Sequence, residues 1–252
     1  MSRFGNLELD GQHEDLEQTS ALKDQAYYMA EARTAHEMAN FEKALRYYSK
    51  VLEYDPQLTA AWGGQVRMLI ELGEYREAKV WAEKALERFP RDPELLAAKG
   101  VALGRLGELN EALAFSDASI EERGESAYVW LARADVLLAR KESRANYCLD
   151  KAMLIAAGDW FIAWLAARIH MFYEQFSLAL KILQQAVQTN PGLFTLWLDL
   201  GRCQAAVGMR TPAEISFRQA RVLNPDCIQP DQIRERLSGS RLRGFWRRLF
   251  SS

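Results

Sequence analysis

A 34-residue period constrains this chain more than any other feature of its sequence. Small residues recur at steps of 34, 34, 33, 34 and 34 positions, at Ala44, Ala78, Ala112, Ala145, Ala179 and Ala213. A second series lies seven residues further on and keeps the same steps, at Val51, Ala85, Ser119, Ala152, Ala186 and Ala220. Self-similarity at a period of this length is typical of solenoids, in which one supersecondary unit stacks on the next.

Each period has room for two helices of about a dozen residues joined by a polar turn. Proline follows the second helical stretch in four periods, at Pro56, Pro90, Pro191 and Pro225. Because proline cannot donate to the helix ladder, it ends that helix. The recurring small residues fit crossings where two helix backbones approach closely, since a larger side chain would overpack them. The sequence therefore predicts an all-α solenoid.

The residues of the second period resemble the tetratricopeptide repeat family. It reads TAAWGGQVRMLIELGEYREAKVWAEKALERFPRD and carries the family's Trp62, Leu69, Gly73, Tyr75, Ala78, Ala85 and Pro90. The resemblance implies a right-handed superhelix of antiparallel helix pairs. We expect six repeats followed by a short capping helix over residues 228–237; the repeats are residues 25–58, 59–92, 93–126, 127–159, 160–193 and 194–227.

The middle of the array departs from the pattern. The fourth repeat has one residue fewer between Ala134 and Ala145, in its inter-helix turn, and it ends in AAGD instead of a proline. The third repeat has Gly124 where others have proline. We therefore expect the least regular geometry in the third and fourth repeats.

Charge is nearly balanced over the whole chain but not at its ends. The formal net charge is −2, from 32 Lys and Arg against 34 Asp and Glu. Residues 1–24 carry six acids and two bases, and residues 238–252 carry four arginines and no acid. A nearly neutral body argues against nucleic acid as the main ligand. We expect residues 1–24 to be a flexible acidic segment.

No motif of an enzyme, a metal site or an export signal is present. The three histidines, His13, His36 and His170, make no zinc-binding spacing, and we interpret the latter two as surface or packing residues. No phosphate-binding glycine loop or nucleophile elbow occurs, so we expect no catalysis and no cofactor. The three cysteines are widely spaced, and the first residues lack an apolar run, which together favour a cytoplasmic location.

The family resemblance implies that positions 2, 5, 9, 12 and 13 of each first helix line a concave groove. Position 9 is arginine in four of six repeats, at Arg33, Arg67, Arg168 and Arg202, and Arg105 occupies position 13 of the third repeat. Guanidinium groups bind carboxylates with two parallel hydrogen bonds, so this row suits an acidic partner segment. The alternative is that these arginines pair with groove acids such as Glu37, Glu71 and Asp135.

Apolar groove positions cluster in the fourth and fifth repeats. They are Tyr128, Leu131, Phe161, Trp164, Met171 and Phe172. A contiguous exposed set of this kind marks a partner site. The alternative for Trp164 is the packing position that Trp62, Trp130 and Trp197 share, but that shift would place the charge of Arg168 at the small-residue crossing. We therefore expect Trp164 to face the groove.

The C-terminal segment, residues 238–252, reads as a basic amphipathic tail behind a Ser-Gly-Ser hinge. Its apolar residues recur at helical spacing, at Leu242, Phe245, Trp246, Leu249 and Phe250, and its charges are Arg241, Arg243, Arg247 and Arg248. Such a segment suits weak, reversible docking on an anionic membrane surface or a partner's groove. The alternative is that it packs on its own solenoid as another cap.

These features predict a non-enzymatic protein-protein interaction scaffold that binds a partner segment in its concave groove. A second reading is a peripheral membrane adaptor that acts mainly through the tail. A third, which the neutral body disfavours, is an RNA-binding repeat protein.

Overall fold

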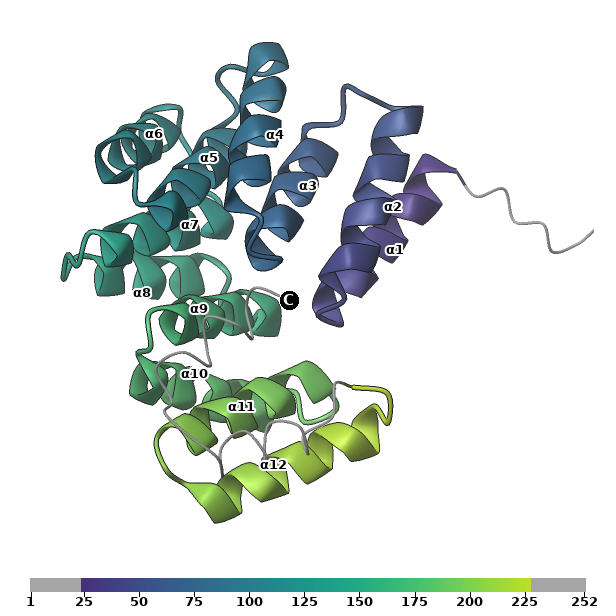
Figure 1. The fold of residues 1–252 in the computed structure, drawn as a ribbon, viewed down its shortest axis with the longest axis vertical. Helices are drawn as coiled ribbons and strands as arrows, with labels where there is room; N and C mark the ends of the chain where they lie inside the picture. Colours follow the sequence, from purple (N-terminus) through teal and green to yellow (C-terminus); the bar gives the residue numbers. More distant parts are fainter. Residues whose placement is uncertain (1–23, 228–252) are drawn as a thin grey trace, which may run out of the picture.

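The computed structural model describes residues 24–227, in which twelve helices and no strand are found. The expected capping helix (228–237), the basic tail (238–252) and residues 1–23 lie outside the described residues. The helices are α1 (Gln25–Glu37), α2 (Phe41–Tyr54), α3 (Thr59–Glu71), α4 (Tyr75–Arg88), α5 (Pro93–Leu106), α6 (Leu109–Glu121), α7 (Ala127–Ala139), α8 (Ala145–Ile155), α9 (Trp160–Phe172), α10 (Phe176–Thr189), α11 (Phe194–Ala206) and α12 (Arg210–Leu223). The predicted all-α solenoid is confirmed, and two helices fall within each expected repeat (Figure 1).

Each turn between the two helices of a repeat contains one residue with positive φ. These residues are Ala39, Gly73, Gly107, Lys141, Glu174 and Gly208, with φ between 54° and 87°. A left-handed residue after a helix lets the next amide groups bond back to the last carbonyls of that helix. Glu74 N, for example, donates to Leu69 O at 2.9 Å. The chain therefore reverses in the same way six times.

Aspartate, asparagine and serine side chains cap five of the helices at their N-termini. The Asp92 carboxylate accepts from the amides of Glu94 and Leu95, both at 3.0 Å, and Pro93 follows as the first helical residue of α5. Asp159 caps α9 in the same way. A side-chain oxygen at this place satisfies amides that have no partner within the helix.

The inter-repeat turns explain the recurring tryptophans. The indole Nε1 of Trp62 donates to Pro56 O at 2.9 Å, and that of Trp197 donates to Pro191 O at 2.7 Å. Each ring thus holds the turn that precedes its own helix. Trp130 follows a turn without proline, and its ring packs edge-on against Tyr147 with Lys151 above it.

The middle of the solenoid is the least regular part, as expected. Helix α8 has 11 residues where the other second helices have 13 or 14, because its first turn is replaced by residues 142–144. The two inter-repeat turns that lack proline each contain a left-handed residue, Arg123 or Gly158. A Cβ on Gly124 would lie 2.4 Å from Ser119 O, so the close approach of the chain there requires glycine.

The superhelix curls until its first repeat touches its fifth. Figure 1 shows α1 and α2 facing the end of α9 across the molecule. Ala39 and Phe41 pack against the apolar core that α9, α10 and α11 form, and the rings of His36 and Phe161 meet edge to face at 4.9 Å. Contacts between repeats that are far apart in the sequence therefore close off part of the concave side, between the first and the fifth repeat.

Candidate functional site

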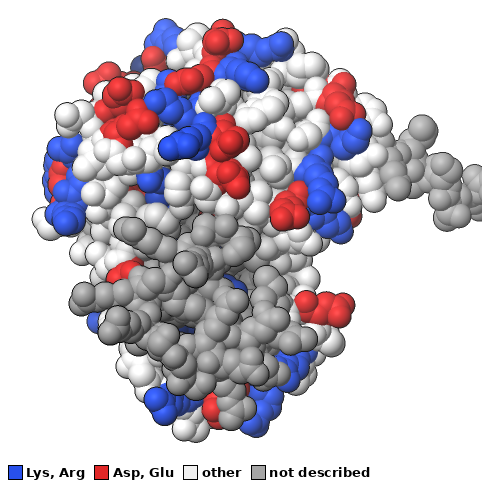
Figure 2. All heavy atoms as spheres, in the orientation of Figure 1, with Lys and Arg blue, Asp and Glu red and all other residues white. Residues whose placement is uncertain are grey.

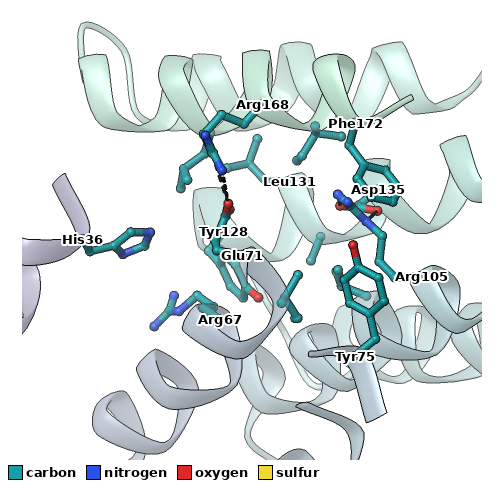
Figure 3. Close-up of a pocket in the computed structure, with 15 residues that line it drawn as sticks. His36, Arg67, Glu71, Tyr75, Arg105, Tyr128, Leu131, Asp135, Arg168 and Phe172 are labelled. Atoms are coloured by element: carbon teal, nitrogen blue, oxygen red, sulfur yellow. Dashed lines mark hydrogen bonds and ion pairs between the residues drawn. The ribbon is translucent and has the colours of Figure 1, made fainter. Parts of the chain in front are cut away.

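A cavity of about 70 Å³ lies on the concave side, between the first helices of the first five repeats. Fifteen residues line it, and ten of them are labelled in Figure 3. Six of the ten groove residues expected from the sequence are among the fifteen: Arg67, Arg105, Tyr128, Leu131, Arg168 and Phe172. The expected residues outside this lining are Arg33, Phe161, Trp164 and Arg202.

Arg105 and Asp135 form a buried ion pair at one end of the cavity. Arg105 Nε donates to Asp135 Oδ1 at 2.9 Å, and the second nitrogen of the fork bonds Oδ2. Burial by itself lowers the pKa of Arg105, but the neighbouring Asp135 carboxylate outweighs it and raises that pKa above its ordinary value. The guanidinium group also lies 3.2 Å from the centre of the Phe172 ring. This arginine is held rigidly within the protein.

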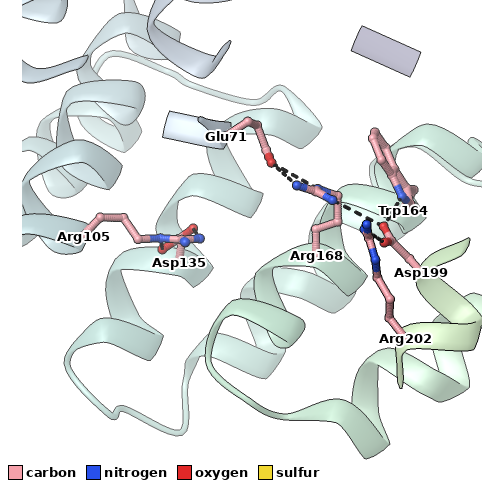
Figure 4. A network of polar contacts seen from close by, with 7 residues as sticks. All are labelled: Glu71, Arg105, Asp135, Trp164, Arg168, Asp199 and Arg202. Atoms are coloured by element: carbon pink, nitrogen blue, oxygen red, sulfur yellow. Dashed lines mark hydrogen bonds and ion pairs between the residues drawn. The ribbon is translucent and has the colours of Figure 1, made fainter. Parts of the chain in front are cut away.

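Arg168 joins three repeats (Figure 4). Its Nε donates to Glu71 Oε2 at 3.1 Å, and its Nη1 lies 3.4 Å from Asp199 Oδ2. Asp199 also accepts from Arg202 Nη1 at 2.7 Å. Burial alone lowers the pKa of Arg168, but Glu71 and Asp199 raise it, so the side chain stays charged.

Arg67 is the most accessible arginine of the cavity, with a side chain that is 22% exposed. Its Nη1 lies 3.2 Å from Glu94 Oε2, its Nε donates to Gly63 O, and its guanidinium group stacks 4.4 Å from the centre of the Tyr128 ring. The Glu94 side chain is 36% exposed, so water screens much of its charge. Burial raises the pKa of Tyr128, which keeps this phenol neutral.

The row of arginines is thus largely paired within the protein, which is the alternative that the sequence left open. Arg33 lies at the surface, 3.1 Å from Glu37, and Arg202 is bound to Asp199. On the face shown in Figure 2, basic and acidic side chains are interspersed instead of separating into a patch of one sign. Any carboxylate that enters the groove meets arginines that already have partners.

The expectation of an exposed apolar patch is wrong for Trp164, Met171 and Leu131. Trp164 and Met171 are fully buried and Leu131 is 2% exposed, although Leu131 still lines the cavity. Trp164 does occupy the groove position of the repeat, and its Nε1 donates to Asp199 Oδ2 at 2.8 Å. It is buried in the apolar core that α9, α10 and α11 form, and the His36 ring of the first repeat lies 6.4 Å from it. Phe161, Phe172 and Tyr128 remain half-buried.

His36 is the cavity residue that the sequence interpretation missed. It lies at position 12 of the first repeat, a groove position of the family pattern, and it is 6% exposed. Burial, together with the nearby charges of Arg67 and Arg168, lowers its pKa from 6.5 to about 3. Its Nε2 is buried and has no hydrogen-bond partner among the described residues. The position within the repeat could have identified it.

Two further absences concern the described part of the chain. Within residues 24–227 no group of three or more His, Cys, Asp and Glu side chains is placed to hold a metal ion. Over the same residues, every helix is too short or too polar to cross a bilayer.

Comparison with known proteins agrees with the helix-pair architecture. A family model described as "Tetratricopeptide repeat" matches residues 8–154. No curated protein sequence matches this chain.

Three solved structures illustrate the similarity of fold. A chain of the APC/C hetero-tetramer Cut9-Hcn1 has a TM-score of 0.52 at 15% identity, with 86% of this chain and 44% of that chain covered. A tetratricopeptide repeat protein from Parabacteroides merdae has a TM-score of 0.54 at 16% identity, covering 88% and 86%. A thermophilic one from Thermus thermophilus has a TM-score of 0.55 at 19% identity, covering 73% and 99%. The match to the Cut9-Hcn1 structure thus covers less than half the length of that chain.

Proposed function

Since this chain belongs to the tetratricopeptide repeat family, we propose that it is a non-enzymatic interaction scaffold that binds an acidic or apolar segment of a protein partner on its concave face. The family is typically a scaffold fold that mediates protein-protein interaction. The APC/C structure, in which a similar solenoid is part of a hetero-tetramer, is an example of such use.

One observation carries this proposal: six residues that the repeat pattern assigns to the groove line a single cavity. They come from four different repeats, so the solenoid gathers them although they span about 100 positions in the sequence. Apolar walls with a few convergent polar groups are typical of binding sites. Half-buried Tyr128 and Phe172 provide aromatic contact area for a partner side chain.

Affinity capture with mass spectrometry tests the proposal when the full-length chain and two variants are compared. Arg67→Gln removes a charge at the cavity, while Arg33→Gln removes one from the same repeat position at an exposed site. We expect Arg67→Gln to lose a specific partner that the parent chain and Arg33→Gln both retain. Equal recovery of every partner by all three proteins would contradict binding at the cavity.

We also propose reversible docking through the basic residues 241–250, in which the spacing of Leu242, Phe245, Trp246, Leu249 and Phe250 predicts an amphipathic helix. Four arginines near an anionic lipid surface contribute roughly 1 kcal/mol each, and partial burial of the apolar residues adds to this. Co-sedimentation with vesicles that contain anionic lipid tests it. The full-length chain should sediment and a form ending at Ser240 should not; equal sedimentation rules this function out.

A further inference from the structure

The first repeat meets the fifth along a small seam at the end of α1. The His36 ring lies 4.9 Å from the ring of Phe161 and 6.4 Å from that of Trp164, between centroids. Ala39 and Phe41, which follow in the turn and at the start of α2, pack on the apolar core of α9, α10 and α11. These contacts are aromatic and apolar, so they do not depend on one hydrogen-bonded geometry.

The helix pair of the first repeat has a core that does not depend on this seam. Ala44 and Val51 of α2 are fully buried in one cluster with Ala32 of α1 and with Ala61 and Met68 of α3. Solenoid repeats are stabilised by their own packing and by their nearest neighbours. Separation of the seam therefore leaves this core intact, and α1 and α2 can move away from α9 as one body.

The histidine at the seam makes its separation easier. His36 Nε2 is buried and has no hydrogen-bond partner among the described residues. Opening breaks no hydrogen bond at this atom and exposes it to water, which can donate or accept for either tautomer. One aromatic pair shifts an equilibrium by a factor of roughly two to ten. A seam of a few such contacts is weak enough for an open state in the range of roughly 0.1–10% that minor conformations occupy.

The seam closes one side of the concave cavity. Of the fifteen residues that line the cavity in the described part of the chain, His36 alone comes from the first repeat. In Figure 3 it reaches the space from its own helix, apart from the other walls. A space of about 70 Å³ holds several water molecules or one small side chain, but not a segment of several residues. Movement of the first repeat away from α9 would enlarge this space.

We propose that the α1–α2 pair is a gate, which moves away from α9 as one body and admits a partner segment to the concave face only in the open state. The closed arrangement is then autoinhibitory. This inference rests on the proposed function for the partner and adds the conformational step that controls its access. Because only the open state binds, the apparent affinity falls with the open population, and a change at the seam alters that affinity by the same factor.

Opening can be measured without a partner by placing a thiol in the cavity wall. Val101 lines the cavity and is 5% exposed, so the thiol introduced by Val101→Cys is shielded in the closed state. The full-length chain with this substitution is treated with fluorescein-5-maleimide, a reagent much larger than the cavity, and labelled peptides are quantified by mass spectrometry. Cys148, which is buried in the core of the fourth repeat, reports general loosening in the same molecules.

Three variants in this background change the seam in opposite directions or leave it alone. Phe161→Ala removes a ring contact and should speed labelling at position 101 about fivefold or more. His36→Phe replaces the imidazole with an apolar ring, favours the closed state and should slow labelling about fivefold or more. Phe89→Ala truncates a half-buried ring outside the seam, in a cluster with Trp62, and should leave labelling unchanged.

Three results would overturn the gate. They are equal labelling at position 101 in the parent and Phe161→Ala chains, equal or faster labelling in the His36→Phe chain, and a matching rise at Cys148. The last of these would show general loosening or unfolding instead of motion at the seam, so a variant that fails to fold also counts against the proposal.

Partner capture separates this inference from the proposed function. Below saturation, the partner that Arg67→Gln fails to retain should be recovered in larger amount by Phe161→Ala and in smaller amount by His36→Phe. Equal recovery by these two variants would refute the control of binding by the gate and leave the scaffold function standing. No recovery by any form, the Phe161→Ala chain included, would refute the scaffold function, while the labelling rates still decide whether the gate opens.

Discussion

Arg168 Nε donates to Glu71 Oε2 at 3.1 Å, although the two residues are 97 positions apart in the chain. Glu71 ends α3 in the second repeat, and Arg168 lies in the middle of α9 in the fifth. Solenoid repeats usually contact only their neighbours. This ion pair and the packing of Phe41 near α9 therefore convert an open row of repeats into a nearly closed ring.

Removing one partner of this ion pair should destabilise the fold strongly. Arg168→Met leaves Glu71 without its buried cation and Asp199 with Arg202 alone, so we expect the free energy of unfolding to fall by about 3–5 kcal/mol in urea titration. Replacing Glu71 with Gln in the same chain should restore part of the loss. Arg33→Met, at an exposed pair, is the matched control and should change stability little.

Removing the ring contact between the first and fifth repeats should loosen one end of the molecule only. Phe161→Ala deletes a half-buried ring that meets His36 at 4.9 Å, so α1 and α2 should exchange amide hydrogens about tenfold faster or more. Helices α11 and α12 should keep their protection. Phe115→Ala, at a half-buried ring on α6, serves as the control; equal loss of protection in α1 and α2 for both variants would contradict the ring closure.

Two adjacent glycines of α3 should respond oppositely to alanine. A Cβ on Gly64 would lie 2.5 Å from the Tyr48 ring, so Gly64→Ala forces α2 and α3 apart and should destabilise the fold by about 1–3 kcal/mol. A Cβ on Gly63 would lie 3.3 Å from the flexible end of Arg67 and at ordinary contact distance, 3.9 Å, from Leu95. Because alanine favours a helix, Gly63→Ala should be neutral or stabilising by up to about 1 kcal/mol, which thermal unfolding can measure.

Lowering the pH should destabilise the fold through His36, because this side chain is buried in its neutral form. Its pKa is about 3 in the folded chain and 6.5 when exposed, so the unfolded chain binds the proton first as pH falls. The stabilisation present above pH 6.5 is then lost, by roughly 2.5 kcal/mol between pH 7.5 and pH 4.5. The difference in unfolding free energy between the parent chain and His36→Phe, measured across this range, isolates the effect from other titrating groups. A parallel pH dependence of the two proteins would refute it.

Periodic residues predicted the architecture well because each reports a local requirement. Ala44 and its equivalents mark close helix crossings, and Pro56 and its equivalents mark helix ends, so the helix pairs and the irregular fourth repeat followed from spacing alone. The expected register of Trp164, at the groove position and not at the alternative packing position, also agrees with the structure, since Ala167 is fully buried and Glu174 is the left-handed turn residue.

The exposure of the groove could not be predicted in the same way. The repeat pattern gives the direction in which Trp164 and Arg168 point, but their burial depends on how tightly the superhelix is wound. Small tilts at each repeat add up over five repeats before His36 and Phe41 reach α9. No single repeat contains that information, so the sequence predicts only a surface or packing role for His36 and an exposed position for Trp164.

The contact between the first and fifth repeats has a consequence for synthesis of the protein. Phe41 leaves the ribosome 120 residues before Phe161, which at about 5–20 residues per second is a delay of roughly 6–24 seconds. During that interval the apolar edge of the first repeat has no docking surface, whereas neighbouring helix pairs can already stack. Its folding should therefore finish late, and its exposed edge makes the nascent chain a candidate client for chaperones that hold apolar segments.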